Sequence, residues 1–259
     1  MPDPGLRPVV LITGAAHRIG RQIACALAEA GWNIAVHYRS SASDAQHTLR
    51  LLETFGGRHC LVQADLNDES DTRRLFTDTL DALGRVDAVI NNAAVFEYDE
   101  ATSFSTASLQ QHMLPNLVAP LVLAQELHRH VSTTRPKEQA VVVNLLDQKL
   151  SNPNPDFLSY TLSKAALKTA TTMLAKALAP HVRVVGVSPG LTLPSHLQTD
   201  EAFQKTHRMA PLGQASTPTD IARAVHFLLH SPSITGIDLV VDGGQHLVGM
   251  DRDFSMMDT

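Results

Sequence analysis

The chain has few cysteines, no long apolar run and no signal-like N-terminus, and each absence excludes a class of protein. Its 259 residues include two cysteines, Cys25 and Cys60. Each falls in an apolar helix or strand pattern, so we expect reduced core thiols rather than a disulfide or a metal pair. No segment approaches the ~20 consecutive apolar residues of a membrane-spanning helix, and residues 1–8 have no hydrophobic core or cleavage site. We therefore expect a cytoplasmic protein with no membrane partner.

The charge pattern argues against nucleic acid as a partner. The formal net charge is −5 and there is no long basic run to contact a polyanion. The histidines do not form a metal site either, because His128 and His130 are two apart on a predicted helix and face different directions. No cluster of His, Cys and carboxylates has the spacing of metal ligands, so no metal is expected. The 44% of apolar residues is ample for a core, and we predict one domain, residues 1–259.

The chain does contain a strand that runs into a helix through a glycine-bearing turn. Residues 9–12 are a short, mostly β-branched run, typical of a buried strand. Apolar residues then recur at helical spacing until Gly31, where the helix is expected to end. Such a turn lets backbone N–H groups approach a pyrophosphate at the positive end of the helix dipole, which predicts a dinucleotide site. The candidate residues in the turn are Gly14, His17, Arg18, Ile19 and Gly20.

This turn lacks the middle glycine of the common G-x-G-x-x-G fingerprint and carries Arg18 close to the helix N-terminus. A cation there opposes the helix dipole by about 0.3–1 kcal/mol. An anion beside it would reverse that balance. We therefore expect Arg18 to face cofactor phosphate or an acidic or polar edge of the substrate, the alternative being a solvated side chain.

The end of the second predicted strand, residues 33–38, lacks the acidic residue that binds the ribose diol in NAD sites. Instead the strand runs into His37, Tyr38, Arg39, Ser40 and Ser41, which offer a cation and hydroxyl donors suited to a 2′-phosphate. This loop therefore favours NADP(H). The alternative is that Arg39 is only a charged loop residue.

Polar and aromatic residues follow the other central strands. Asp65, next to Leu66, comes just after the third predicted strand, where its carboxylate could accept from adenine or serve turn and N-cap chemistry. Phe96 follows the fourth, in the crevice where open α/β sheets bind ligands, so its ring could stack on a flat heterocycle or pack within the loop. Asn116 is polar within a predicted apolar helix over 106–127, and a buried amide there needs partners.

Asp147, Tyr160 and Lys164 form the candidate catalytic set. Asp147 directly follows a predicted strand over 141–146, and Tyr160 is the first residue of a helix predicted to run to Ala179. Tyr160 and Lys164 are four apart, so both side chains emerge on one face at the ligand-bearing end. A free phenol has a pKa near 10. We expect the ammonium, together with the positive nicotinamide of the oxidised complex, to lower this pKa toward about 7 and make Tyr160 a usable acid.

These motifs resemble, in type and in order, those of the short-chain dehydrogenase/reductases. Over nearly the whole chain they resemble the pteridine reductase branch, which includes bacterial dihydromonapterin reductase. The shared features are a Thr-Gly-x-x-x-Arg-x-Gly loop containing Arg18, the Arg39–Ser40 pair, Asn-Asn-Ala followed by Phe96, and Asp147 with Tyr160 and Lys164. The alternation of strands and helices independently predicts an α/β fold, a Rossmann-type doubly wound parallel sheet with helices on both faces.

The resemblance assigns roles to residues along the chain. It implies that NADPH is bound by the glycine turn, by the end of the second strand, and by Asp65, Leu66, Asn92, Ala93, Ala94, Asn116, Tyr160, Lys164, Pro189, Gly190, Leu191 and Thr192. In this branch the substrate pterin lies between the nicotinamide and the aromatic ring, which implies contacts with Arg18, Phe96, Asp147 and Tyr160. Asn116 is implied to hold a water near Lys164. Ala94 departs from some relatives, which carry a ligand-contacting serine there.

Asp147 stands where ordinary members of the family carry a serine that holds the substrate carbonyl. A carboxylate would repel that oxygen, whereas it would accept from ring N–H groups, and a protonated acid would donate. Both options fit a nitrogen heterocycle better than a ketone, unless Ser151 or Ser159 takes the serine role. We therefore expect an NADPH-dependent reductase that transfers hydride to a ring C=N of dihydromonapterin, dihydrobiopterin or dihydrofolate. The alternatives are a general NADPH-dependent carbonyl reductase and an NADP(H)-sensing binding protein without turnover.

The last part of the chain breaks the regular alternation. Residues 193–216 are an insertion and a candidate substrate lid. A predicted helix over 218–229, with Thr217 as its N-cap, and a predicted strand over 238–241 follow. The Met-rich tail could pack on a neighbouring subunit or fray. Because the family commonly forms tetramers, we expect packing and a homotetramer.

Overall fold

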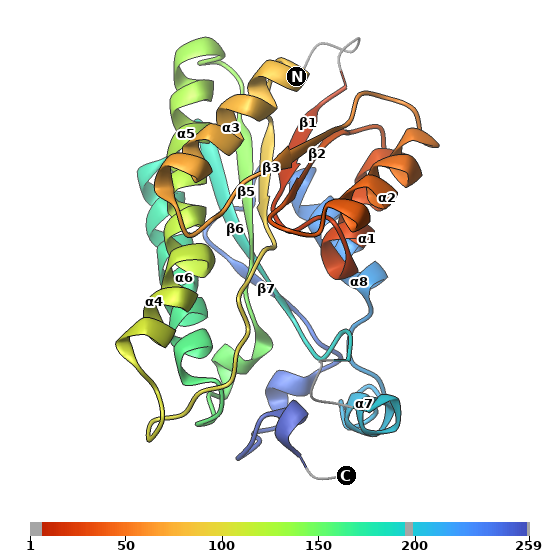
Figure 1. The fold of residues 1–259 in the computed structure, drawn as a ribbon, viewed down its shortest axis with the longest axis vertical. Coiled ribbons are helices and arrows are strands. Elements are labelled where there is room, and N and C mark those ends of the chain that lie inside the picture. The colour runs from red at the N-terminus through yellow and green to blue at the C-terminus, as the bar shows by residue number, and fades with distance from the viewer. Residues whose placement is uncertain (1–6, 195–198, 258–259) are drawn as a thin grey trace.

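Within residues 7–194 and 199–257, which the computed structural model describes, seven parallel strands form one sheet (Figure 1). The strands are β1 (Val9–Ile12), β2 (Asn33–Tyr38), β3 (Cys60–Gln63), β4 (Ala88–Asn91), β5 (Ala140–Leu145), β6 (Val182–Pro189) and β7 (Asp238–Val241). Their spatial order is β3-β2-β1-β4-β5-β6-β7, so the strand order reverses between β1 and β4. Open sheets bind ligands outside the carboxyl ends of the strands at such a reversal.

Helices cover both faces of the sheet (Figure 1). One layer contains α1 (Arg18–Glu29), α2 (Ala42–Glu53) and α8 (Pro218–Leu229), and the other contains α3 (Glu69–Leu83), α5 (Ala119–Thr134) and α6 (Leu158–Ala177). Side chains alternate between the faces of a strand. Val10 and Ile12 therefore join the core under the first layer, and Val9 and Leu11 join the core under the second. The predicted doubly wound parallel sheet is confirmed.

Local chemistry sets most of the element boundaries where the sequence predicts them. Helices α1 and α3 end next to Gly31 and Gly84. Both glycines have positive φ angles, which residues with a side chain rarely adopt. At α8 the predicted N-cap Thr217 forms a capping box with Asp220, in which each side chain binds the other's backbone N–H.

The single long helix predicted over 106–127 is wrong in detail. The structure has α4 (Thr106–Met113), a π-helical turn (Leu114–Val118) and then α5, which continues to Thr134. Pro115 and Pro120 each remove a backbone donor, so this segment cannot keep a continuous α-helical ladder. The wider turn places Asn116 between the end of β4 and α6.

The strands end toward the lower part of Figure 1, where α7 (Asp200–His207) and the C-terminal segment lie. Short helical turns over Gln148–Ser151, Gln245–Leu247 and Phe254–Met256 complete this end of the molecule. Any site built on the strand ends is therefore enclosed by segments from both the middle and the end of the chain.

Candidate active site

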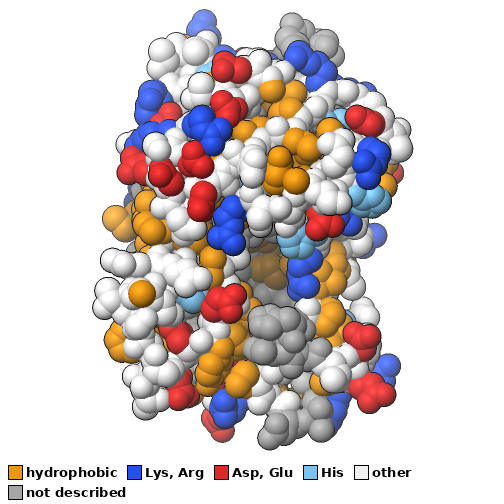
Figure 2. Space-filling view, in the orientation of Figure 1, with side chains coloured by type: hydrophobic (Ala, Val, Ile, Leu, Met, Phe, Trp, Pro, Cys, Tyr) orange, Lys and Arg blue, Asp and Glu red, His pale blue; other side chains and the backbone are white. Residues whose placement is uncertain are grey.

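Two adjoining cavities form one cleft at the carboxyl ends of the strands. We call them the nucleotide cavity, of about 360 Å³, and the catalytic cavity, of about 630 Å³. The residues that line both are Arg18, Ile19, Arg39, Asn92, Ala94 and Val95. Gly14 and Gly20 line the nucleotide cavity, whereas Tyr160 and Lys164 line the catalytic cavity. In the space-filling view the surface is hollowed near the middle of the face shown (Figure 2).

The Asn-Asn-Ala motif holds the glycine turn in place. Asn92 Nδ2 donates to the carbonyl oxygens of Thr13 and Gly14 at 2.9 and 3.1 Å. Thr13 Oγ1 accepts from the backbone N–H groups of Asn92 and Ala93 at 3.0 Å each. A Cβ at Gly20 would lie 2.4 Å from Gly14 O and 2.6 Å from Asn92 Nδ2, so only glycine fits there. The result is a tight backbone cradle at the N-terminus of α1, suited to a pyrophosphate.

His37 also holds the glycine turn, a role that the sequence does not predict. The residue is 2% exposed and lines the nucleotide cavity. Its Nδ1 accepts from the N–H of Gly14 at 3.0 Å, and its Nε2 lies 3.1 Å from Ala64 O, to which it donates as the neutral tautomer. Burial lowers the pKa of His37 to about 4, although the hydrogen bond to Ala64 opposes this. The available signal is a polar residue inside the otherwise apolar second strand.

The ends of β2 and β3 face the nucleotide cavity as expected for an adenosine site. Arg39 is exposed and lines both cavities, where a guanidinium can pair with phosphate. Asp65 lines the nucleotide cavity beside Leu66 and also performs turn chemistry: its Oδ1 accepts from the backbone N–H and Nδ2 of Asn67 at 3.0 and 2.7 Å. The N-cap of α3 is Asp68, so the capping alternative for Asp65 is wrong.

Arg18 lies at the boundary between the two cavities. Its φ of +55° lies in the left-handed region, which favours glycine and is uncommon for other residues. Its Nη2 donates to Pro194 O at 3.0 Å, so the guanidinium reaches the start of the predicted lid, 193–216. Leu193 lines the catalytic cavity. Residues 195–198 lie outside the described residues, and the lid stays a prediction.

The structure brings Asp147, Tyr160 and Lys164 together in the catalytic cavity. The Tyr160 hydroxyl donates to Asp147 Oδ2 at 2.8 Å. Asp147 Oδ1 accepts from the backbone N–H of Lys149 at 2.8 Å, which fixes the carboxylate plane. Lys164 Nζ lies 5.9 Å from the Tyr160 ring centre and donates to Leu145 O at 2.6 Å.

The pKa of Tyr160 moves in the direction opposite to the one expected. Burial and the neighbouring Asp147 carboxylate raise the pKa of the phenol well above its usual value. Burial also lowers the pKa of Lys164 to about 8, and its Nζ donates to a backbone carbonyl. The expected shift toward 7 is therefore wrong for the protein alone. Burial raises the pKa of Asp147 as well, so Asp147 and Tyr160 hold a shared proton tightly.

Ser159 and Ser151, the alternatives to Asp147, are directed elsewhere. Ser159 is fully buried: its backbone N–H donates to Asp99 Oδ1 at 2.9 Å, and its hydroxyl donates to Asp99 Oδ2. Ser151 is exposed at the end of its helical turn. Asp147 is thus the polar group that meets Tyr160.

Phe96 lines the catalytic cavity. Its ring stacks on Phe157, with centroids 4.2 Å apart and an interplanar angle of 16°. It meets Tyr160 edge to face at 4.8 Å. Loop packing therefore fixes the Phe96 ring beside the catalytic phenol, where it can contact a flat substrate.

Asn116 is the predicted site residue that the structure places behind the cavity wall. Its Nδ2 donates to Val95 O and to Ser163 Oγ, both at 3.0 Å, and its Oδ1 accepts from the N–H of Val95 at 2.8 Å. Val95 itself lines both cavities. The side chain of Asn116 thus ties the loop after β4 to α6, and both its N–H groups are used within the protein. The predicted water beside Lys164 stays a prediction.

The remaining predicted residues all line the cleft. They are His17, Tyr38, Ser40, Ala93, Pro189, Gly190, Leu191 and Thr192, together with Ile19 and Ala94. Asp253, Phe254 and Ser255 also line the catalytic cavity, although the sequence does not predict them as site residues. The tail therefore packs against its own chain's cavity, partly through the buried ring of Phe254.

Cys25 and Cys60 are free, partly buried thiols, and burial raises the pKa of both, that of Cys60 to about 11. Across residues 7–194 and 199–257, no group of three or more His, Cys, Asp or Glu is placed to hold a metal ion. No helix in that part of the chain has the length and apolar character to cross a membrane.

Known proteins resemble this chain over most of its length. A family model described as enoyl-(acyl carrier protein) reductase, of the short-chain dehydrogenase/reductase type, matches residues 14–246. Pteridine reductase 1 of Leishmania tarentolae is 31% identical over 93% of this chain and 96% of its own. 3beta-Hydroxysteroid dehydrogenase 1 of Eggerthella lenta is 29% identical over 92% of this chain and 93% of its own. FolM alternative dihydrofolate reductase 1 from Brucella canis, whose crystal structure was solved in complex with NADP, is 36% identical in sequence. Its structure matches this one with a TM-score of 0.86, over 93% of this chain and 95% of its own.

Proposed function

Because the chain belongs to the short-chain dehydrogenase/reductase family, we propose that it is an NADPH-dependent reductase that converts a dihydropterin to the tetrahydro form. Asp147 carries this assignment. Its partly buried carboxyl group lines the catalytic cavity and accepts a hydrogen bond from the Tyr160 hydroxyl at 2.8 Å. A carboxylate there suits the N–H groups of a nitrogen heterocycle and repels a carbonyl oxygen. Two similar proteins, named for a pteridine and for dihydrofolate, support the same substrate class.

The residues of the nucleotide cavity fit NADPH. A Cβ at Gly20 would fill the turn, so the backbone cradle for the pyrophosphate depends on glycine. A Cβ at Gly190 would lie 2.4 Å from Gln245 Oε1, so the backbone on the nicotinamide side is equally constrained. Arg39 and Ser40 provide a cation and a hydroxyl for the 2′-phosphate. NADPH, when bound, supplies the hydride, and two Brucella relatives have been solved with NADP.

Tyr160 and Asp147 hold the proton that the reduction requires. The phenol donates to the carboxylate, and burial raises the pKa of both groups, so the pair retains its proton at neutral pH. A substrate ring nitrogen beside this pair can accept that proton while the adjacent carbon is reduced. Lys164, with a pKa of about 8, is largely charged at pH 7 and stabilises the negative charge that remains on the pair.

Replacing Asp147 with Ser tests the assignment directly. Losing a charge-assisted hydrogen bond costs about 1.5–3 kcal/mol, so kcat/KM for dihydrobiopterin should fall roughly 10- to 150-fold. The Kd for NADPH, followed by nicotinamide fluorescence, should stay nearly unchanged. Ser151→Ala is the matched control, because Ser151 lies four residues away on the exposed end of the same turn.

Four outcomes would reject the proposal. Unchanged dihydropterin reduction by Asp147→Ser would remove Asp147 from the substrate site. Efficient reduction of simple ketones by the wild type, with none of dihydropterins, would favour a carbonyl reductase, as would a loss of activity in Ser151→Ala. NADPH binding without turnover of any substrate would favour a sensing protein.

A further inference from the structure

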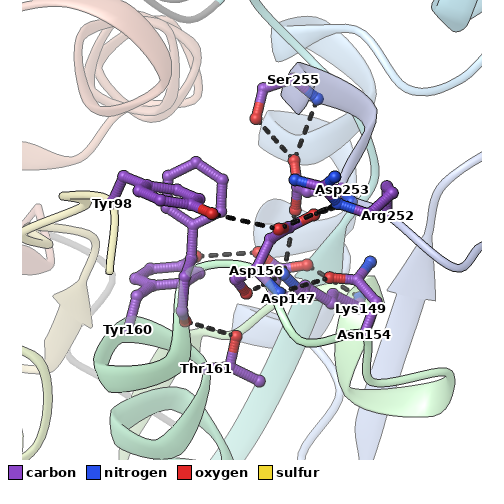
Figure 3. A network of polar contacts seen from close by, with 11 residues as sticks. Tyr98, Asp147, Lys149, Asn154, Asp156, Tyr160, Thr161, Arg252, Asp253 and Ser255 are labelled. Atoms are coloured by element: carbon purple, nitrogen blue, oxygen red, sulfur yellow. Dashed lines mark hydrogen bonds and ion pairs between the residues drawn. The ribbon is translucent and has the colours of Figure 1, made fainter. Parts of the chain in front are cut away.

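The C-terminal segment Arg252–Ser255 closes one side of the catalytic cavity. Asp253, Phe254 and Ser255 line this cavity, and Phe254 is largely buried. Asp253 Oδ1 accepts from the backbone N–H and the hydroxyl of Ser255 at 3.0 and 2.7 Å, so the segment forms a compact turn (Figure 3). A substrate in the catalytic cavity would contact this turn.

Lys149 connects this segment to the catalytic carboxyl group. Its side chain is 5% exposed, and its Nζ lies 3.1 Å from Asp253 Oδ2 and 2.5 Å from Asp156 O (Figure 3). Its backbone N–H donates to Asp147 Oδ1 at 2.8 Å. One residue therefore fixes Asp147 through its backbone and the C-terminal segment through its ammonium.

Asp156 provides a second attachment. Its side chain is 3% exposed, and its Oδ2 accepts from Arg252 Nε and from the backbone N–H of Asp253, both at 2.8 Å. Arg252 is about half exposed, so solvent screens its share of the pairing. Lys149 is buried, and its loss would leave Asp253 without a cation at the cavity wall.

We propose that Lys149 is a positioning residue that clamps Arg252–Ser255 against the catalytic cavity, and that the clamped segment sets the affinity for substrate rather than for nucleotide. The nucleotide cavity is lined by residues between Gly14 and Pro115, and neither Lys149 nor the segment Arg252–Ser255 is among them. Opening the clamp therefore changes the catalytic cavity and leaves the nucleotide cavity intact. The identity of the substrate rests on the proposed function, whereas the clamp itself does not.

Limited proteolysis tests the clamp without any substrate. Trypsin can cleave after Arg252 once the segment opens and exposes its backbone. Breaking a buried charge pair favours such opening, so Lys149→Met should release residues 253–259 about tenfold faster than the wild type, as measured by intact-protein mass. Lys149→Arg, which keeps the cation, should cleave at close to the wild-type rate. Asp251→Asn is the matched control, because Asp251 is exposed in the same tail.

Steady-state kinetics tests the role in substrate affinity. In Lys149→Met, KM for dihydrobiopterin should rise about tenfold, while the Kd for NADPH changes less than about twofold. Asp253→Asn removes the same pair from the other side and provides the same test if Lys149→Met does not fold. Wild-type cleavage rates in both variants would overturn the clamp. Faster cleavage with an unchanged KM would overturn its role in substrate affinity. A wild-type enzyme that does not reduce dihydropterins would instead contradict the proposed function, and the cleavage experiment would still decide the clamp.

Discussion

Mild acid should destabilise the protein through His37. The pKa of this buried ring is about 4 in the folded protein, against about 6.5 for an exposed histidine. Because the folded pKa is lowered, the unfolded chain binds more protons, and stability falls as the pH falls. The contribution is fully present above pH 6.5 and is lost progressively toward pH 4. Linkage gives a loss of about 2 kcal/mol between pH 7.5 and pH 5.0 from this residue.

The physical reason is the hydrogen bond at the glycine turn. His37 Nδ1 accepts from the N–H of Gly14 at 3.0 Å, and a protonated ring would place a donor against that donor. Asparagine at this position keeps an acceptor and does not titrate. The free energy of unfolding in urea should therefore fall by about 2 kcal/mol less for His37→Asn than for the wild type between these pH values. The control is His47→Asn, since His47 is exposed on α2.

An equal pH dependence for the wild type and His37→Asn would refute this reasoning. It would mean that the pKa of the ring in the folded protein is close to that of an exposed histidine. A pH dependence that changes equally in His47→Asn would point to the overall charge rather than to the ring at the turn.

Three further measurements test the nucleotide cavity, the catalytic cavity and the N-terminal cap of α8. Arg39→Asp should narrow or reverse the preference for NADPH over NADH, because a phosphate partner becomes a repulsive carboxylate; equal Kd values for the two cofactors in the wild type would contradict this. Glu97 lines the catalytic cavity, so Glu97→Gln should lower KM for dihydrofolate, whose tail is anionic, by about threefold relative to dihydrobiopterin. Parallel changes for both substrates would place the tail elsewhere. Thr217→Ala removes the capping box of α8 and should lower the free energy of unfolding by about 1 kcal/mol without altering KM; no loss of stability would show that the cap is dispensable.

The features that depend on neighbours in the chain were predictable. The alternation of strands and helices, the stop at Gly31 and the cap at Thr217 are local, and the structure has all of them. The four-residue spacing of Tyr160 and Lys164 likewise places both side chains in one cavity.

The features that depend on distant contacts were not predictable. The pKa of Tyr160 is set by burial and by Asp147, thirteen residues earlier, and its direction cannot be taken from the ammonium alone. His37 becomes part of the site only because β1 and β2 are neighbours in the sheet. Asn116 lies within a π-helical turn that no apolar spacing indicates, and its side chain binds the backbone of Val95.

The clamp between Lys149 and Asp253 also bears on how the protein is made. The N-terminal part of a chain leaves the ribosome first and can begin to fold there. The glycine turn, the partner strands that hold it and the Asp147–Tyr160 pair are all synthesised before β7. Asp253 emerges within the last few residues of the described chain. A nascent chain can therefore complete its nucleotide cavity early, while the catalytic cavity gains this wall only after residues 253–255 have been synthesised.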